Sequence, residues 1–162
     1  MVDKIFAPWR SEYILSGDKK EGGCIFCDYP KEDKDEENLI IHRGKLCFVI
    51  MNRYPYSAGH LMVIPCRHLH NFAELTADEL TELMQLAQKA VETLTEVMRP
   101  DGFNLGMNIG KVAGAGIDQH LHLHVVPRWN GDTNFMPVVG DTRVISEALE
   151  SAWKRLKEGW IQ

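Results

Sequence analysis

A strict alternation of histidine and leucine constrains this chain more than any other feature of its 162 residues. The run His120-Leu121-His122-Leu123-His124 continues into Val125. Side chains alternate between the two faces of an extended strand, so the pattern predicts three imidazoles on one face and three apolar side chains on the other. We therefore expect a strand that is anchored in the core and presents a row of histidines to a ligand.

Three histidines within five positions allow several interpretations. A half-buried strand without a function is disfavoured, because three adjacent imidazoles need hydrogen-bonding partners and gain nothing in packing. A catalytic metal ion held by the row, as His-x-His pairs do in zinc hydrolases, lacks an obvious glutamate base beside the run. The glycine-rich turn at 110–116 precedes the run, and its backbone N–H groups can approach an anion closely. The combination favours a phosphate bound next to His122.

Hydrophobic patterns elsewhere predict a mixture of strands and helices. Short apolar runs at 39–41 and 46–51 indicate a hairpin, and 60–64 and 102–109 indicate further strands. A helix should begin after Thr76, which forms a capping-box pattern with Glu79, and should end at Pro100. Its apolar stripe comprises Leu80, Leu83, Met84, Ala87, Val91, Leu94 and Met98, and a second stripe, from Ile145 to Trp160, indicates a C-terminal helix.

Composition narrows the function further. With 44% hydrophobic and 25% charged residues, the chain is typical of a globular domain, and no repeat or long linker divides it. The net charge of -5 argues against a polymeric nucleic acid as partner. The acidic run at 31–38 has no apolar anchor and is interpreted as a surface loop. The absence of a signal-peptide pattern and of a long apolar segment predicts a cytoplasmic protein that does not enter a membrane.

The histidine run resembles the motif of the histidine triad superfamily, in which apolar residues alternate with and follow the three histidines. The resemblance covers roughly residues 40–130 and includes 52–55, 59–65, the central helix and 103–127. Flanking segments at 7–10 and 127–135, together with a Cys-x-x-Cys pair, resemble the prokaryotic branch of diadenosine tetraphosphate phosphorylases. The resemblance implies an α+β fold with a five-stranded antiparallel sheet, a long helix, a C-terminal helix and a homodimer.

The resemblance also implies roles for individual residues. His122 would be the nucleophile, His124 would bind the phosphate or the leaving oxygen, and His120 would support the site. Nucleotide contacts would come from Asn52, His60, Asn108, Gly114, Ala115, Gly116 and Ile117. Many family members carry serine or glutamine where this chain has Gly116, so handling of the leaving group would fall to His124 or to Asp132 and Asn134.

Cys24 and Cys27 have the spacing of a zinc knuckle, and such a pair in a reducing compartment favours metal or redox chemistry over a structural disulfide. The related galactose-1-phosphate uridylyltransferases imply His68 and His120 as the remaining ligands of a structural zinc ion. The alternative is a pair of buried thiols without metal. No organic cofactor is expected. His42 and His70 are interpreted as surface or supporting residues.

We expect one domain over 1–162, with an N-terminal segment at 1–38, a core at 39–130 and a C-terminal extension at 131–162. Its predicted function is nucleotidyl transfer at the α-phosphate of a small nucleotide, an adenine nucleotide first of all, with diadenosine polyphosphates cleaved by phosphate. The alternatives are a hydrolase of nucleoside phosphoramidates or dinucleoside polyphosphates and a nucleotide-binding module without turnover.

Overall fold

The computed structural model describes residues 23–132, 145 and 147–161, and these form a five-stranded sheet. Its order is β1-β2-β3-β5-β4, and all neighbouring strands are antiparallel. The strands are β1 (Ile40–Arg43), β2 (Cys47–Met51), β3 (Leu61–Pro65), β4 (Gly102–Gly106) and β5 (Leu123–Arg128). The expected hairpin is confirmed as β1 and β2, and the α+β fold with a five-stranded antiparallel sheet is confirmed as a whole.

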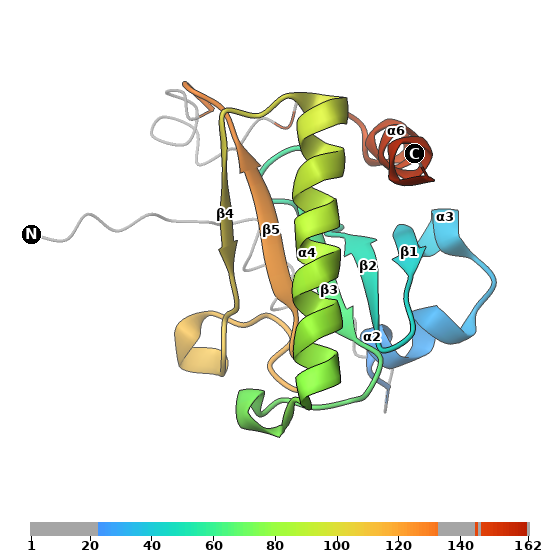
Figure 1. Ribbon diagram of the computed structural model, residues 1–162, viewed down its shortest axis with the longest axis vertical. Helices are drawn as coiled ribbons and strands as arrows, with labels where there is room; N and C mark the ends of the chain where they lie inside the picture. The colour runs from blue at the N-terminus through green and yellow to red at the C-terminus, as the bar shows by residue number, and fades with distance from the viewer. Residues whose placement is uncertain (1–22, 133–144, 146, 162) are drawn as a thin grey trace, which may run out of the picture.

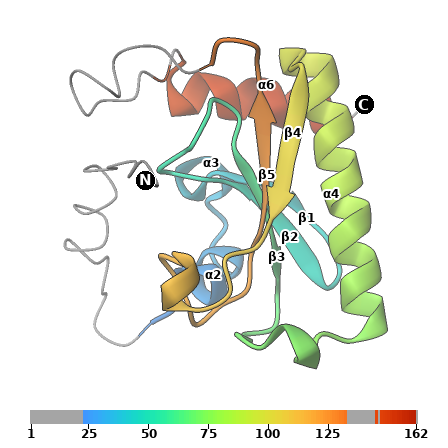
Figure 2. The same ribbon diagram turned by 90° about the vertical axis from the view of Figure 1, so that its left-hand side faces the viewer.

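Helix α4 (Ala77–Met98) covers one face of the sheet (Figures 1 and 2). The predicted capping box is present, since Thr76 and Glu79 each bind the other's backbone N–H. The predicted stripe is wrong at Leu80 and Met84, which are exposed. The buried line instead runs through Leu83, Ala87, Ala90 and Leu94, because a sheet contacts only one narrow side of the helix.

The opposite face of the sheet carries short elements (Figure 2). They are α2 (Ile25–Asp28), η1 (Tyr29–Lys31), α3 (Asp35–Asn38) and, after the glycine-rich turn begins, η3 (Lys111–Ala113). Helix η2 (Phe72–Glu74) precedes α4. Residues far apart in sequence thus meet over one face, which leaves α4 to close the hydrophobic core from the other.

The acidic run was expected to be a surface loop, and this prediction is wrong for its second half. Residues 35–38 form α3, whose Asp35 accepts from Arg43 at 2.7 Å and from Lys157 at 3.1 Å. Arg43 also donates to the carbonyl of Glu32 at 2.7 Å. Ionic contacts therefore replace the apolar anchor that the sequence lacks, and Asn38 at the end of α3 is buried.

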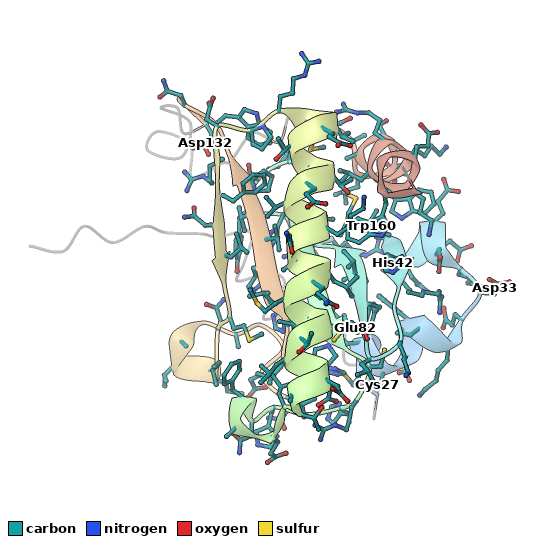
Figure 3. All side chains as sticks on the ribbon, in the orientation of Figure 1. Cys27, Asp33, His42, Glu82, Asp132 and Trp160 are labelled. Carbon is teal, nitrogen blue, oxygen red and sulfur yellow. The ribbon has the colours of Figure 1, made fainter. Side chains whose placement is uncertain are left out.

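The predicted C-terminal helix is confirmed as α6 (Leu149–Ile161), which packs against β1 and α4. Its inner face buries Ala152, Trp153, Leu156 and Trp160. The indole of Trp153 donates to the carbonyl of Ile40 at 3.1 Å, and the ring of Trp160 stacks on His42 (Figure 3). His42 is therefore partly covered by α6. None of the described helices has the length and apolar character needed to cross a membrane.

One carboxylate fixes the turn between β1 and β2 to α4. Glu82 Oε1 accepts hydrogen bonds from the backbone N–H groups of Lys45, Leu46 and Cys47, at 2.7, 2.9 and 3.1 Å. Gly44 lies so close to this carboxylate and to the carbonyl of Cys47 that a β-carbon there would collide with both. Burial alone would raise the pKa of Glu82, but the three N–H groups lower it below its usual value.

We predict that Glu82→Gln lowers the free energy of unfolding by roughly 1–3 kcal/mol, because the three donors lose a charged acceptor. The folded pKa of Glu82 is lowered, so its stabilising effect is complete above the usual glutamate pKa and is lost as the pH falls through the folded value. Chemical denaturation at neutral and at acidic pH measures both effects.

Glu92→Gln is the matched control, because Glu92 lies exposed on the same helix. An equal loss in the two variants, or a difference that does not shrink at acidic pH, would contradict the role assigned to Glu82.

Candidate active site and metal cluster

The histidine row lies at the start of β5 and divides in two. Strand β5 begins only at Leu123, so the expected alternation does not extend back to His120. His122 and His124 line a cavity, whereas the ring of His120 lies beside cysteines and His68. The expected strand is confirmed only from Leu123 onward, because the chain before it is not paired as a strand. His120 therefore has other neighbours than His124, although the ring of Phe26 contacts both His120 and His122.

The floor of the cavity is a row of paired residues that crosses the sheet. His124 pairs with Met62, Met62 pairs with Ile50, and Ile50 pairs with Ile40. Directly paired residues share a face of the sheet. The cavity is lined by Ile25, Phe26, Tyr29, Asn38, Leu39, Ile50, Met51, Asn52, Arg53, Tyr54, Tyr56, Met62, Asn108, Gly116, Ile117, His122 and His124. Apolar side chains thus form much of its wall, and His122 and His124 belong to the same lining.

The main chain fixes the protonation of His122. Its Nδ1 lies 2.8 Å from the carbonyl oxygen of His120, which can only accept, so the neutral ring carries its proton on Nδ1. The lone pair is then on Nε2. Burial lowers the pKa of His122 below the usual histidine value, against the raising effect of the His120 carbonyl. A neutral ring with Nε2 unprotonated is the form that a nucleophile requires.

A second chain of hydrogen bonds fixes the tautomer of His124. The backbone N–H of Tyr56 donates to Nδ1 of His60 at 3.1 Å, so neutral His60 carries its proton on Nε2. That nitrogen lies 2.9 Å from Nδ1 of His124, which must accept. Neutral His124 therefore carries its own proton on Nε2. The ring centroids of His122 and His124 lie 4.9 Å apart, so a hydrogen-bond donor lies beside the ring of His122.

The other residues predicted to bind nucleotide fall into three groups. Asn52, Asn108, Gly116 and Ile117 line the cavity. His60 is fully buried and contacts His124 and Asn52, so it supports the site from behind. Gly114 and Ala115 are in the adjoining turn and do not belong to the cavity lining, although Gly114 ends η3 with a left-handed φ of 89°.

Cys24, Cys27, His68 and His120 form a compact cluster, with all four potential ligand atoms within 4.8 Å of one another. Nδ1 of His120 lies 3.3 Å from Sγ of Cys24, and Nδ1 of His68 lies 3.2 Å from Sγ of Cys27. The other nitrogen of His120, Nε2, lies 2.8 Å from the carbonyl oxygen of Pro65 and therefore carries the proton. Nδ1 of His120 is thus free of a proton and directed at the thiols.

The chemistry of the four donors fits a metal ion of the zinc type. Burial and the neighbouring Cys24 raise the pKa of Cys27 to about 11, so without a cation this thiol stays neutral at pH 7. Burial lowers the pKa of His120 to about 4, which keeps its imidazole in the neutral, ligating form. A cation would turn the thiols into thiolates and compensate for their burial. Of the three histidines in the row, the cluster includes only His120, which disfavours a catalytic metal held by the row.

Asp132 was expected as one possible residue to help with the leaving group, but in this chain it lies far from His122. Its carboxylate accepts from Arg128 Nη2 at 2.9 Å, at the far end of β5. The six residues of β5, at about 3.3 Å each, separate that end from His122. Figure 3 shows Asp132 and Cys27 at opposite ends of the molecule. Asn134 lies outside the described residues.

Several cavity residues escaped the sequence analysis. Ile25 and Phe26 lie between the two cysteines, and the ring of Phe26 contacts His120 and His122 at centroid distances of 5.6 and 5.3 Å. Their position inside the Cys-x-x-Cys pair could have indicated a cavity wall next to the two cysteines. Asn38 gave no such signal, because it ends a run whose composition is typical of solvent-exposed loops.

Comparison with known proteins agrees with this geometry. The HIT domain matches residues 33–131. A Mycobacterium tuberculosis protein named AP-4-A phosphorylase is 39% identical over 99% of this chain and 86% of its own length. An asymmetrical bis(5'-nucleosyl)-tetraphosphatase of Schizosaccharomyces pombe is 32% identical over 57% of this chain and 50% of its own length. A hypothetical histidine triad nucleotide-binding protein of Sulfolobus tokodaii has a similar structure, with a TM-score of 0.69 and 29% identity over 85% of this chain and 92% of its own. This chain therefore belongs to the histidine triad (HIT) family.

Proposed function

We propose that this protein transfers a nucleotidyl group through His122, and that its reaction is the phosphorolysis of diadenosine tetraphosphate to ADP and ATP. The observation that carries the proposal is the hydrogen bond from His122 Nδ1 to the carbonyl of His120, which leaves Nε2 unprotonated in a residue that lines the cavity. The similarity over nearly the whole chain to the mycobacterial AP-4-A phosphorylase supports the choice of substrate.

In the first step, Nε2 of His122 attacks the α-phosphorus and forms a P–N bond. The P–O bond to the rest of the substrate breaks, and ATP leaves as an anion that keeps the electron pair and needs no proton. The ring is then substituted on Nε2 and protonated on Nδ1, so it carries a positive charge that the carbonyl of His120 stabilises. The Nε2–H of His124 donates to an oxygen of the phosphate as negative charge develops there.

In the second step, an oxygen of inorganic phosphate attacks the same phosphorus. A new P–O bond forms, the P–N bond breaks, and the electron pair returns to Nε2 of His122. The product is ADP, and the histidine is again neutral and ready for another cycle. Two displacements at one phosphorus thereby replace a direct reaction between two anions.

The remaining cavity residues would hold the nucleotide. Asn52 would contact ribose, and the hydrogen bond that its Oδ1 accepts from the N–H of Tyr54 at 2.9 Å would hold its side chain in position. Asn108, Gly116 and Ile117 would surround the phosphate. His60 would orient His124, and Gly114 and Ala115 would shape the turn that brings Gly116 to the cavity.

Hydrolysis is the second candidate, because the Schizosaccharomyces pombe relative is named a tetraphosphatase. Water would then replace phosphate in the second step and yield AMP. Gly116 has no side chain to exclude either acceptor, so the identity of the product distinguishes the two reactions.

Incubation with diadenosine tetraphosphate and phosphate should yield ADP and ATP, whereas omission of phosphate should stop ADP formation. His122→Asn should lower turnover on the order of 10³-fold or more while nucleotide binding persists, because asparagine cannot form the intermediate. Chromatography of the products and calorimetric binding measure the two properties.

His70→Asn is the control, because His70 is an exposed histidine outside the site. AMP plus ATP at a rate independent of phosphate would establish the hydrolase instead. Nucleotide binding without any turnover of the unsubstituted protein would identify a binding module.

We also propose that the Cys24, Cys27, His68 and His120 cluster holds a structural zinc ion. The ion would supply the charge that keeps both thiols deprotonated, and the four ligands would tie the N-terminal segment to the start of β5. The close approach of all four ligand atoms and the unprotonated Nδ1 of His120 support this proposal.

Cys24, Cys27, Cys47 and Cys66 form no disulfide bond, which favours a location in the reducing cytoplasm. Cell fractionation can test this location.

The purified protein should contain about one zinc ion per chain. Cys24→Ser and Cys27→Ser should lose the metal together with several degrees of thermal stability, because metal binding is coupled to folding of this segment. Elemental analysis and thermal melting measure both.

Cys66→Ser serves as control, since Cys66 is exposed and outside the cluster. If protein prepared without chelator contains no zinc, the proposal of a zinc site is wrong.

We further propose a homodimer formed through β4. This strand is an edge of the sheet, and it exposes Leu105 at 46%, with Met84 of α4 also exposed at 54%. The other edge, β1, is contacted by α6. Within the described residues β4 pairs only with β5, and such an edge beside exposed apolar side chains is suited to pairing with another strand.

Light scattering should therefore give the mass of two chains. Leu105→Lys should shift the measured mass toward that of a single chain. Glu150→Lys on the exposed side of α6 should leave the mass unchanged. The mass of a single chain for the unsubstituted protein would contradict the dimer.

A further inference from the structure

Asn38 lies at the end of the cavity that is farthest from the histidines. The row of paired residues crosses from His124 on β5 to Ile40 on β1, and Asn38 and Leu39 come immediately before β1. The backbone of Leu39 pairs with β2 next to Asn52, through a bond of 2.9 Å from the N–H of Met51. With the α-phosphate at His122 and the ribose at Asn52, the base would extend toward Asn38.

The amide of Asn38 is buried and held in one orientation. The residue is 7% exposed, and Nδ2 donates to Oε2 of Glu32 at 3.0 Å. A carboxylate only accepts, so Nδ2 must face Glu32 and Oδ1 must face away from it. The hydrogen bonds among the described residues give Oδ1 no donor, and Asn38 lines the cavity. Oδ1 can therefore accept a hydrogen bond from a ligand in the cavity.

The backbone around Asn38 is also fixed. Leu39 has a φ of 61°, a left-handed conformation that is unfavourable for a bulky residue. The preceding helix is held in place by Arg43 and Lys157 at Asp35, and by Arg53, which donates to the carbonyl of Glu37 at 2.7 Å. Strain at a cavity wall persists only where neighbouring contacts enforce it, so the position of Asn38 is set independently of any ligand.

We propose that Asn38 determines base specificity, with its Oδ1 accepting a hydrogen bond from the exocyclic amine of adenine. Apolar side chains such as Ile25 and Leu39 would cover the faces of the ring. A purine with an oxo group at position 6 would place a second acceptor against Oδ1, and Glu32 prevents the amide from turning to present Nδ2 instead. The site therefore selects 6-aminopurine over 6-oxopurine nucleotides. This inference rests on the proposed function, because it requires the phosphate of the nucleotide at His122.

The test compares AMP with IMP, in which an oxo group replaces the 6-amino group and N1 carries a proton, by calorimetric binding to the intact protein. AMP should bind on the order of 10-fold more tightly than IMP. Asn38→Ala should lose most of this preference through weaker AMP binding. Glu32→Ala, which keeps Asn38 but frees its amide to turn, should narrow the preference by improving IMP binding. A merely structural role of Asn38 would not produce that gain.

Each outcome decides the proposal. Equal binding of AMP and IMP by the unsubstituted protein would overturn it even if Asn38→Ala does not fold, and so would an equal loss of both affinities in a folded Asn38→Ala protein. If neither nucleotide binds and diadenosine tetraphosphate is not turned over, the proposed function fails as well. Intact turnover with equal binding overturns the specificity alone.

Discussion

The hydrogen bond between Nδ1 of His122 and the carbonyl of His120 connects the side chains that line the cavity with the cluster of Cys24, Cys27, His68 and His120. The ring of His120 is fixed on one side by the carbonyl of Pro65, which ends β3, and on the other by the cysteines. The carbonyl that sets the tautomer of His122 is therefore held by the sheet and by the cysteine and histidine cluster together. Phe26 completes the connection, since its ring lies against both imidazoles. The orientation of the His122 ring thus depends on Cys24, which lies 96 residues before His120 in the chain.

The sequence predicted the parts of the fold that depend on local patterns. The hairpin, the capping box at Thr76 and the C-terminal helix all follow from residues close together in the chain. The division of the histidine row could not be predicted this way, because β5 begins where Leu123 pairs with Val63, and that register is a long-range property. The candidate ligands His68 and His120 came from family resemblance, since spacing alone gave only the two cysteines.

The acidic segment shows why composition misled at one place. A run of charged residues is usually solvated, and nothing within 31–38 indicates burial. Its partners are Arg43 in β1 and Lys157 in α6, the second 122 residues away from Asp35. Whether charges are solvated or paired depends on contacts of this kind, which no local window contains. The wall that Asn38 and Leu39 form was invisible for the same reason.

The contact between α6 and β1 has a consequence for how large an assembly can become. The indole N–H of Trp153 donates a hydrogen bond to the carbonyl of Ile40, and an added strand would otherwise use this carbonyl as an acceptor. A sheet with two open edges can add copies without end and form fibres, whereas a sheet with one open edge can join a single copy by two-fold symmetry. In the proposed dimer, both outer edges would be β1 strands contacted by α6. The helix would then stop the sheet from growing further.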